Sequence, residues 1–146
     1  MQRRLAYAFA ATIVVSLAAA AALAQEATIR PIATVGQIMQ TMIVPFSDAV
    51  FMAASEPPKT DAGWAAVGGS ALALAESGNL LMIGPRARDK AEWMKMARQT
   101  VDAAAAVMKA AAAKDADALS STGDALYETC ESCHMRYMTP SAPAAK

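Results

Sequence analysis

Apolar residues recur every three or four positions along four stretches of the chain, which is the spacing of helices that bury one face. The first stretch covers residues 32–54 and ends before Pro57-Pro58, because a proline disfavours helical backbone at the residue before it. Pro45 should kink this helix. The second stretch begins near Thr60, a suitable N-cap, and is expected to stop at Gly78-Asn79.

The other two stretches lie in the second half of the chain. The third follows Gly84-Pro85, where Asp89 and Glu92 resemble a capping box. The fourth opens near Asp115 and ends before the prolines at 140 and 143. We call the residues of each stretch that are expected to face the core its seam. The seams of the first two stretches are Ile32, Val35, Met39, Met42, Phe46, Ala49 and Ala53; and Trp64, Val67, Ala71 and Leu74. Those of the last two are Trp93, Met96, Thr100, Ala103, Val107 and Ala110; and Leu119, Gly123, Leu126, Cys130, Cys133 and Tyr137.

These seams predict one all-α domain, an antiparallel four-helix bundle with short connections. The composition agrees, because 55% of the residues are apolar and alanine and methionine both favour helix. Bundles of this kind build cofactor sites from side chains on facing helices.

Residues 1–24 have the layout of a cleaved signal peptide. Arg3 and Arg4 precede an apolar stretch, and Ala22-Leu23-Ala24 gives the small-x-small pattern that predicts cleavage before Gln25. The domain would then cover residues 25–146, and the protein would be periplasmic. The stretch is also long enough for an uncleaved membrane anchor, which remains the alternative.

The charge balance limits the partners. Thirteen basic residues match thirteen acidic ones, and two of the basic ones lie in the leader, so the mature chain is slightly acidic. A nucleic-acid partner or an anionic membrane surface would require a basic patch, so neither is expected. We also expect no further stretch that is long and apolar enough to span a membrane.

The chemistry is concentrated in Cys130-Glu131-Ser132-Cys133-His134, a C-x-x-C-H sequence of the kind that attaches heme c. Positions i, i+3 and i+4 share one face of a helix, so both sulfurs and the imidazole can reach one planar ring. The two thiols would form thioethers with the heme vinyl groups, and His134 would ligate the iron.

Other uses of these residues account for the sequence less well. A thioredoxin-like pair needs a βαβ setting, and a structural zinc site needs four ligands, whereas the chain has two cysteines and one histidine. A disulfide would leave the adjacent histidine unexplained. With a single histidine, the sixth iron position must hold methionine, a weaker donor, or nothing.

A C-x-x-C-H near the C-terminus, on the last of four helices, resembles the class II cytochromes c. That family includes cytochrome c′ and its low-spin relatives, and the resemblance covers residues 26–138. It implies a left-handed antiparallel four-helix bundle with one covalent heme near one end. Low-spin members resemble a pattern in which a methionine of the first helix binds iron, whereas high-spin cytochrome c′ leaves that position open.

In this chain the resemblance implies Met39 as the distal ligand, with Met42 one turn further along as the alternative. Methionines on a helix seam are usually core residues, so an open iron site also remains. Arg136 lies where the family often has a basic residue, so the resemblance implies that it pairs with a heme propionate or biases the environment of His134. An ordinary solvated arginine is the alternative. Phe46, Trp64, Trp93 and Tyr127 are expected to be ordinary core aromatics.

The predicted function is electron transfer by a His/Met heme, with unidentified redox proteins as partners. The alternative is a cytochrome c′-type protein that binds nitric oxide or carbon monoxide at an open iron. No enzyme activity is expected, because the only histidine already ligates iron and no nucleophile–base pair can be assembled. Relatives also form dimers, so a homodimer is one expected state.

Overall fold

The computed structural model describes residues 29–138 of the chain. The chain divides into two compact units, residues 1–30 and 31–146, and the fold described here belongs to the second. The predicted signal peptide, its cleavage site and the prolines at 140 and 143 lie outside the described residues.

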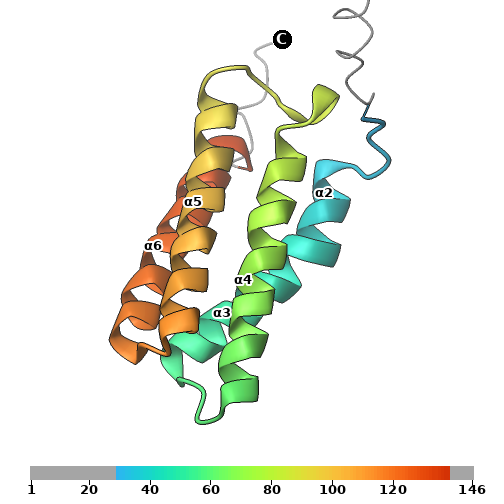
Figure 1. The fold of residues 1–146 in the computed structure, drawn as a ribbon. Coiled ribbons are helices and arrows are strands. Elements are labelled where there is room, and N and C mark those ends of the chain that lie inside the picture. Colours follow the sequence, from blue (N-terminus) through green and yellow to red (C-terminus); the bar gives the residue numbers. More distant parts are fainter. Residues whose placement is uncertain (1–28, 139–146) are drawn as a thin grey trace, which may run out of the picture. The chain divides into compact units, whose positions relative to one another are not determined.

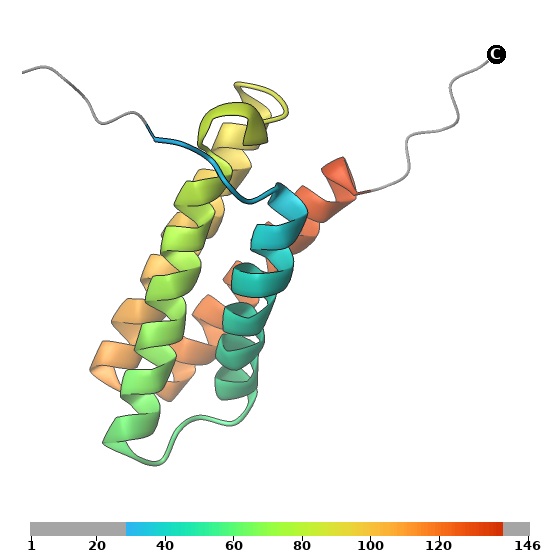
Figure 2. The same ribbon diagram turned by 90° about the vertical axis from the view of Figure 1, so that its right-hand side faces the viewer.

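All regular elements of the described chain are helices, and neighbouring long helices are antiparallel (Figures 1 and 2). The first long helix has three parts, and the other three long helices are uninterrupted. The elements are α2 (Val35–Ile38), the π-helical turn η1 (Met39–Ile43), α3 (Val44–Ser55), α4 (Asp61–Leu81), the 3₁₀ turn η2 (Gly84–Arg86), α5 (Glu92–Ala113) and α6 (Ala116–Tyr137).

These helices pack as a closed ring. α4 lies between α3 and α5, and α6 lies between α5 and α3, so each long helix has two neighbours. The predicted all-α, antiparallel four-helix bundle is therefore confirmed. In this topology the start of α2, the end of α4, the start of α5 and the end of α6 lie at one end of the bundle (Figure 2).

Side-chain caps fix where three of the helices begin. The Thr60 hydroxyl accepts a hydrogen bond from the Gly63 amide at 3.1 Å, and the Asp115 carboxylate accepts one from the Ala118 amide at 2.9 Å. Both residues were predicted as helix starts. Thr34 forms a full capping box with Gln37, which the sequence pattern had not led us to expect.

The start of α5 differs from the expected capping box. Asp89 Oδ1 accepts hydrogen bonds from the Glu92 amide at 2.8 Å and the Trp93 amide at 3.0 Å. The Glu92 side chain does not reach back to Asp89 but forms an ion pair with Lys95 at 3.4 Å. Asp89 thus satisfies two free amides of the first turn by itself.

The predicted seam of the first helix is only partly right, because Val35, Met39, Met42, Phe46 and Ala53 are half-buried against the core and the other two residues are not. Ile32 is 92% exposed and Ala49 is also exposed. The buried residues of this helix are Ile38, Ile43, Ser47 and Val50. The step from 38 to 43 is five residues because the π turn η1 inserts an extra residue into the helical repeat, which shifts every later position around the helix axis.

Pro45 provides a physical reason for this π turn. A proline has no N–H to donate, and its ring collides with the carbonyl oxygen four residues earlier, here that of Thr41. In η1 the Val44 amide donates to the Met39 carbonyl five residues back, so the turn is widened directly before the proline. The distortion expected at Pro45 therefore takes the form of a π turn.

The seams of the other three helices agree better with the prediction. All four predicted residues of α4 are buried, as are Leu119, Gly123 and Leu126 of α6. In α5 the core residues Trp93, Thr100, Val107 and Ala110 were predicted, whereas Met96 and Ala103 are only half-buried.

Gly78 does not end α4, as the sequence had suggested, but lies buried inside it. A Cβ atom at this position would lie 2.8 Å from Val101 Cγ2 of α5. The missing side chain lets α4 and α5 approach closely, and α4 continues to Leu81. The stop predicted at Gly78-Asn79 is therefore too early.

The continuous helix from Val35 to Ser55 is long and apolar enough to cross a membrane by length and composition alone. Its mean hydropathy reaches 1.3, and 28% of the most apolar window is buried in the bundle. The sequence predicted no stretch of this length and hydropathy after residue 24, and that prediction is wrong. A membrane location does not follow, because one face of this helix packs into the core.

Candidate heme site

A large cavity opens between the first helix and α6. Its volume is about 1220 Å³, above the roughly 300–1,000 Å³ of common small-molecule pockets. The first helix contributes Met39, Ile43 and Phe51 to the lining, and the turn between α4 and α5 contributes Arg86. The cavity therefore lies mainly toward the end of the bundle where α2 begins and α6 ends.

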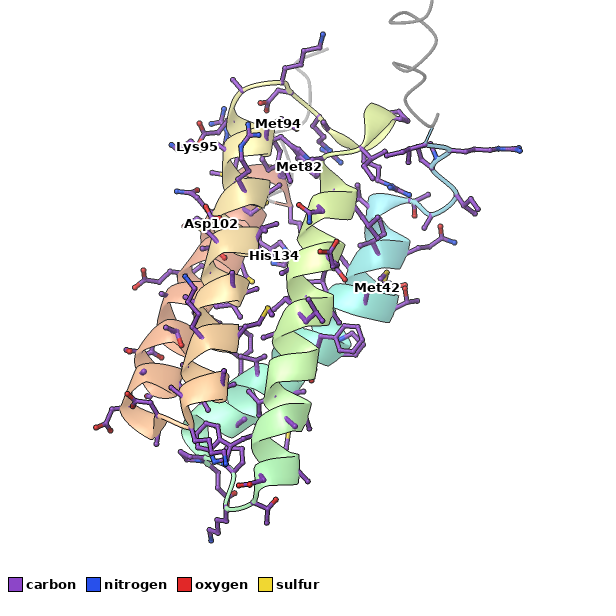
Figure 3. All side chains as sticks on the ribbon, in the orientation of Figure 1. Met42, Met82, Met94, Lys95, Asp102 and His134 are labelled. Carbon is purple, nitrogen blue, oxygen red and sulfur yellow. The ribbon has the colours of Figure 1, made fainter. Side chains whose placement is uncertain are left out.

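Cys130, Cys133 and His134 all line this cavity from α6. The helix is continuous through Tyr137, so the i, i+3, i+4 spacing places the three side chains on one face, as predicted. Both cysteines are half-buried and unpaired, and His134 is exposed (Figure 3). Two thiols and an imidazole are thus presented together at the wall of one cavity.

The environment of the thiols does not favour thiolate chemistry. Burial raises the pKa of Cys130 above its ordinary value, although a hydrogen bond with the Thr129 side chain opposes the shift. Burial also raises the pKa of Cys133, and the neighbouring Cys130 adds to the effect. Reactive redox cysteines have lowered pKa values. A thioredoxin-like role therefore receives no support from these groups.

Met39 and Met42 occupy different places. Met39, the first residue of η1, lines the same cavity as Cys130, Cys133 and His134. Met42 is absent from the lining and is half-buried against the core, as Met82 and Met94 are (Figure 3). The first helix thus turns one thioether, that of Met39, toward the cavity.

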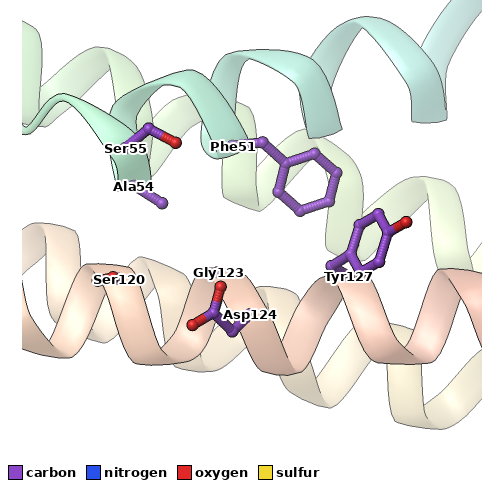
Figure 4. A pocket seen from close by; sticks show the side chains of 7 residues that line it. All are labelled: Phe51, Ala54, Ser55, Ser120, Gly123, Asp124 and Tyr127. Atoms are coloured by element: carbon purple, nitrogen blue, oxygen red, sulfur yellow. The ribbon is translucent and has the colours of Figure 1, made fainter.

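An aromatic pair stands where the first helix and α6 begin to separate. The Phe51 and Tyr127 rings meet edge to face with their centroids 5.9 Å apart. Both rings line the large cavity and also a smaller pocket of about 220 Å³ that lies further along the same two helices (Figure 4). Tyr127 is 56% exposed, so its assignment as a core aromatic is wrong, whereas Trp64 and Trp93 are buried.

A long-range polar contact secures the end of α6 just after the C-x-x-C-H sequence. The Tyr137 hydroxyl donates to Asp89 Oδ2, and the Tyr137 ring packs edge to face on Trp93 with centroids 4.9 Å apart. The bond to Tyr137 lowers the pKa of Asp89 and raises that of Tyr137. The apolar spacing placed Tyr137 on the seam but gave no sign of its partner Asp89, which lies 48 residues away.

Arginines are placed unequally around the cavity. Arg86 is buried and lines it, and Arg88 is exposed and lines it as well. Arg136 is exposed and is not part of the lining. Arg86 was missed because a single arginine in a short turn between two helices carries no recognisable sequence signal.

The residues of the cavity suit a heme. The lining is mainly apolar, which a flat porphyrin requires, and the two thiols and the imidazole come from one wall. Cys130 and Cys133 would hold the thioether bonds and His134 the iron. Met39 offers a thioether from the other helix. The fold and this donor set fit a c-type cytochrome built on a four-helix bundle.

Comparison with known families gives the same answer. Residues 88–138 match the model of the family described as Cytochrome C′, and this region includes α5, α6 and the C-x-x-C-H sequence. The match covers less than half of the chain, so it shows a similarity to the cytochrome c′ family in this region. Proteins of the family carry covalent heme c and are not enzymes, as the sequence predicted. No curated protein and no solved structure matches the chain.

Proposed function

We propose that the protein is an electron-transfer cytochrome whose heme iron is held by His134 and Met39. The observation that carries this proposal is the position of Met39. It lines the cavity that also contains Cys130, Cys133 and His134, whereas Met42 packs against the core. Nitrogen and thioether ligation favours the ferrous state and raises the reduction potential.

The local backbone supports a functional role for this methionine. Met39 begins a π-helical turn, and single π turns occur frequently at functional sites because they redirect side chains. Met39 is half-buried among apolar side chains. A thioether in such surroundings is shielded from water, which would otherwise compete for the sixth iron position.

When bound, heme supplies an iron that changes its oxidation state by one electron. The chain's own residues hold the ring, provide its axial ligands and cover its apolar faces. The exposure of His134 and of the end of α6 keeps part of this site near the surface, where a redox protein could approach. We therefore propose soluble redox proteins as partners.

We propose a periplasmic location. The support is the leader layout of Arg3 and Arg4, the apolar stretch and Ala22-Leu23-Ala24, together with the need of c-type cytochromes for heme attachment after export. Intact-mass analysis of the periplasmic fraction should find residues 25–146 plus one heme. A chain that keeps its leader in the membrane fraction would mean that residues 1–24 form an anchor.

A second function has support of its own. The family match is to cytochrome c′, whose high-spin members leave the distal position open. Nitric oxide or carbon monoxide could then bind at the iron.

A visible spectrum of the ferrous protein separates the two functions. Electron transfer with His134 and Met39 predicts sharp α and β bands and slow carbon monoxide binding. Broad bands and rapid binding would contradict the proposal and favour the gas-binding function, while the heme attachment would stand.

A further inference from the structure

Arg86 is a buried cation without a carboxylate partner in the described part of the chain. Its side chain is 9% exposed. The ion pairs formed within residues 29–138 are Lys95 with Glu92 and Lys114 with Asp61. Glu131 also lines the cavity but forms no ion pair with Arg86. A buried charge is costly unless it is paired, so this site is electrostatically incomplete.

Two hydrogen bonds hold the guanidinium in place. Arg86 Nε donates to the Ala33 carbonyl at 2.9 Å, and Nη1 donates to the Leu80 carbonyl at 3.0 Å. The side chain thereby ties the segment before the first helix to the end of α4. Backbone carbonyls satisfy two of its donors but carry no net charge that could balance the cation.

The remaining donors face open space. A guanidinium has five N–H groups, and Nη2 of Arg86 has no partner among the described residues. Every buried side-chain nitrogen or oxygen in residues 29–138 has a hydrogen-bond partner. Because Nη2 has no such partner, it must be accessible to solvent. Because Arg86 lines the cavity, Nη2 and the second N–H of Nη1 are the donors that remain for whatever fills that cavity.

A guanidinium with a free edge is suited to bind a carboxylate through two parallel hydrogen bonds. Heme brings two carboxylates, its propionates, on the ring edge away from the vinyl groups. The thioether bonds at Cys130 and Cys133 would fix the vinyl edge on α6, and Arg86 reaches the cavity from η2, a different element. We propose that Arg86 binds a heme propionate and thereby positions the heme in its cavity.

This role of Arg86 rests on the covalent heme and not on the identity of the sixth ligand. The residue that binds the propionate is then Arg86 and not Arg136, which the sequence resemblance had suggested as one candidate. Arg136 is exposed and outside the lining, and Arg88 is exposed, so neither is a preformed buried cation. Arg86 is the arginine whose orientation is already fixed by the fold.

The test compares Arg86→Gln and Arg86→Lys with Arg98→Gln in the heme-loaded protein. Arg98 is an exposed arginine of α5 outside the cavity lining, so its variant removes a charge without touching the site. The readouts are the propionate bending mode in resonance Raman spectra and the midpoint potential at one pH. Heme content and far-UV circular dichroism report whether each variant is folded.

We expect Arg86→Gln to shift the propionate mode and to lower the midpoint potential, because a cation near the heme favours the ferrous state. Arg86→Lys should restore most of the potential but not the mode, since an ammonium cannot form the two parallel bonds. Arg98→Gln should change neither.

If Arg86→Gln fails to fold, Arg86→Lys still decides the question, because its propionate mode must shift. An unchanged mode in every folded Arg86 variant would overturn the proposal, as would a shift produced by Arg88→Gln alone. A high-spin wild-type spectrum would defeat electron transfer through Met39 yet leave this comparison intact.

Discussion

The two halves of α6 show how one helix can serve both stability and cofactor binding. In its first half Leu119 and Leu126 are fully buried, and a Cβ atom on Gly123 would lie 2.8 Å from Ala54 Cβ of α3. In its second half the cysteines are half-buried, and His134 is exposed. The same pair of helices is therefore in close contact through small residues at one end, beside the smaller pocket, and separated by the large cavity at the other.

The Phe51–Tyr127 pair lies between these two regions (Figure 4). On one side of it the small residues Ala54 and Gly123 let the helices touch, and on the other side the cavity begins. Close packing of small residues at one end supplies stability that does not depend on the cofactor. The open end can then be shaped by the heme, and its side chains are available for ligation.

The largest expected effect comes from removing the attachment residues of the open end. The double variant Cys130→Ala, Cys133→Ala should lose its heme on acid–acetone extraction and fold poorly, because the large cavity then has no covalently held occupant. The measurement is absorbance of the extracted protein, with Ser132→Ala, an exposed residue between the cysteines, as the control. A double variant that keeps its heme through extraction would refute the attachment site.

The closed end is tested by Gly123→Ala. The new methyl group would collide with Ala54, and overpacking of this kind costs about 1–3 kcal/mol of unfolding free energy. Gly69→Ala is the matched control, because a Cβ there meets nothing within 4 Å. That control should stabilise the protein by up to about 1 kcal/mol through helix propensity. Chemical denaturation measures both, and equal effects would contradict the close contact of α3 with α6.

The smallest effect is expected for Tyr137→Phe, which removes the bond to Asp89 at the open end. Because this bond lowers the folded-state pKa of Asp89, its stabilisation is present above the ordinary carboxyl pKa of 3.8 and is lost as the pH falls through the lowered value. The variant should therefore have a lower melting temperature at about pH 7, and the difference should shrink toward about pH 2.

Tyr127→Phe is the control for that series, because its hydroxyl has no hydrogen bond among the described residues while its ring also packs on another aromatic. Its melting temperature should follow the wild type at every pH. A Tyr137→Phe difference that stays constant across the same pH range would mean that the loss comes from ring packing and not from the bond to Asp89.

The sequence predicted the last three helices better than the first, for a physical reason. In α5 and α6 the polar faces are distinct, so the three-four spacing identifies the buried side. α4 is apolar on most sides, but its helical repeat is unbroken, so the spacing still identifies its buried residues. The first helix is apolar on most sides, and the π turn before Pro45 moves its repeat by one residue, which no regular spacing reveals. For that reason its predicted seam missed the fully buried residues Ile38, Ile43 and Val50.

Within the site, the local part was predictable and the long-range part was not. Cys130, Cys133 and His134 are adjacent in the sequence, and their spacing alone places them on one helix face. Arg86 with Ala33, and Asp89 with Tyr137, join residues about fifty positions apart and depend on how the helix ends meet. Such contacts become visible only when the bundle is assembled.

Whether Met39 supplies the sixth ligand is decided by comparing the ferrous visible spectra of Met39→Ala and Met42→Ala. We expect Met39→Ala to turn a low-spin spectrum into a high-spin one and to gain rapid carbon monoxide binding, because the distal position becomes free. Met42→Ala should keep the low-spin spectrum and lose about 2 kcal/mol of stability as a core truncation. A low-spin Met39→Ala protein beside a high-spin Met42→Ala protein would rule out Met39 and move the ligand one helical turn.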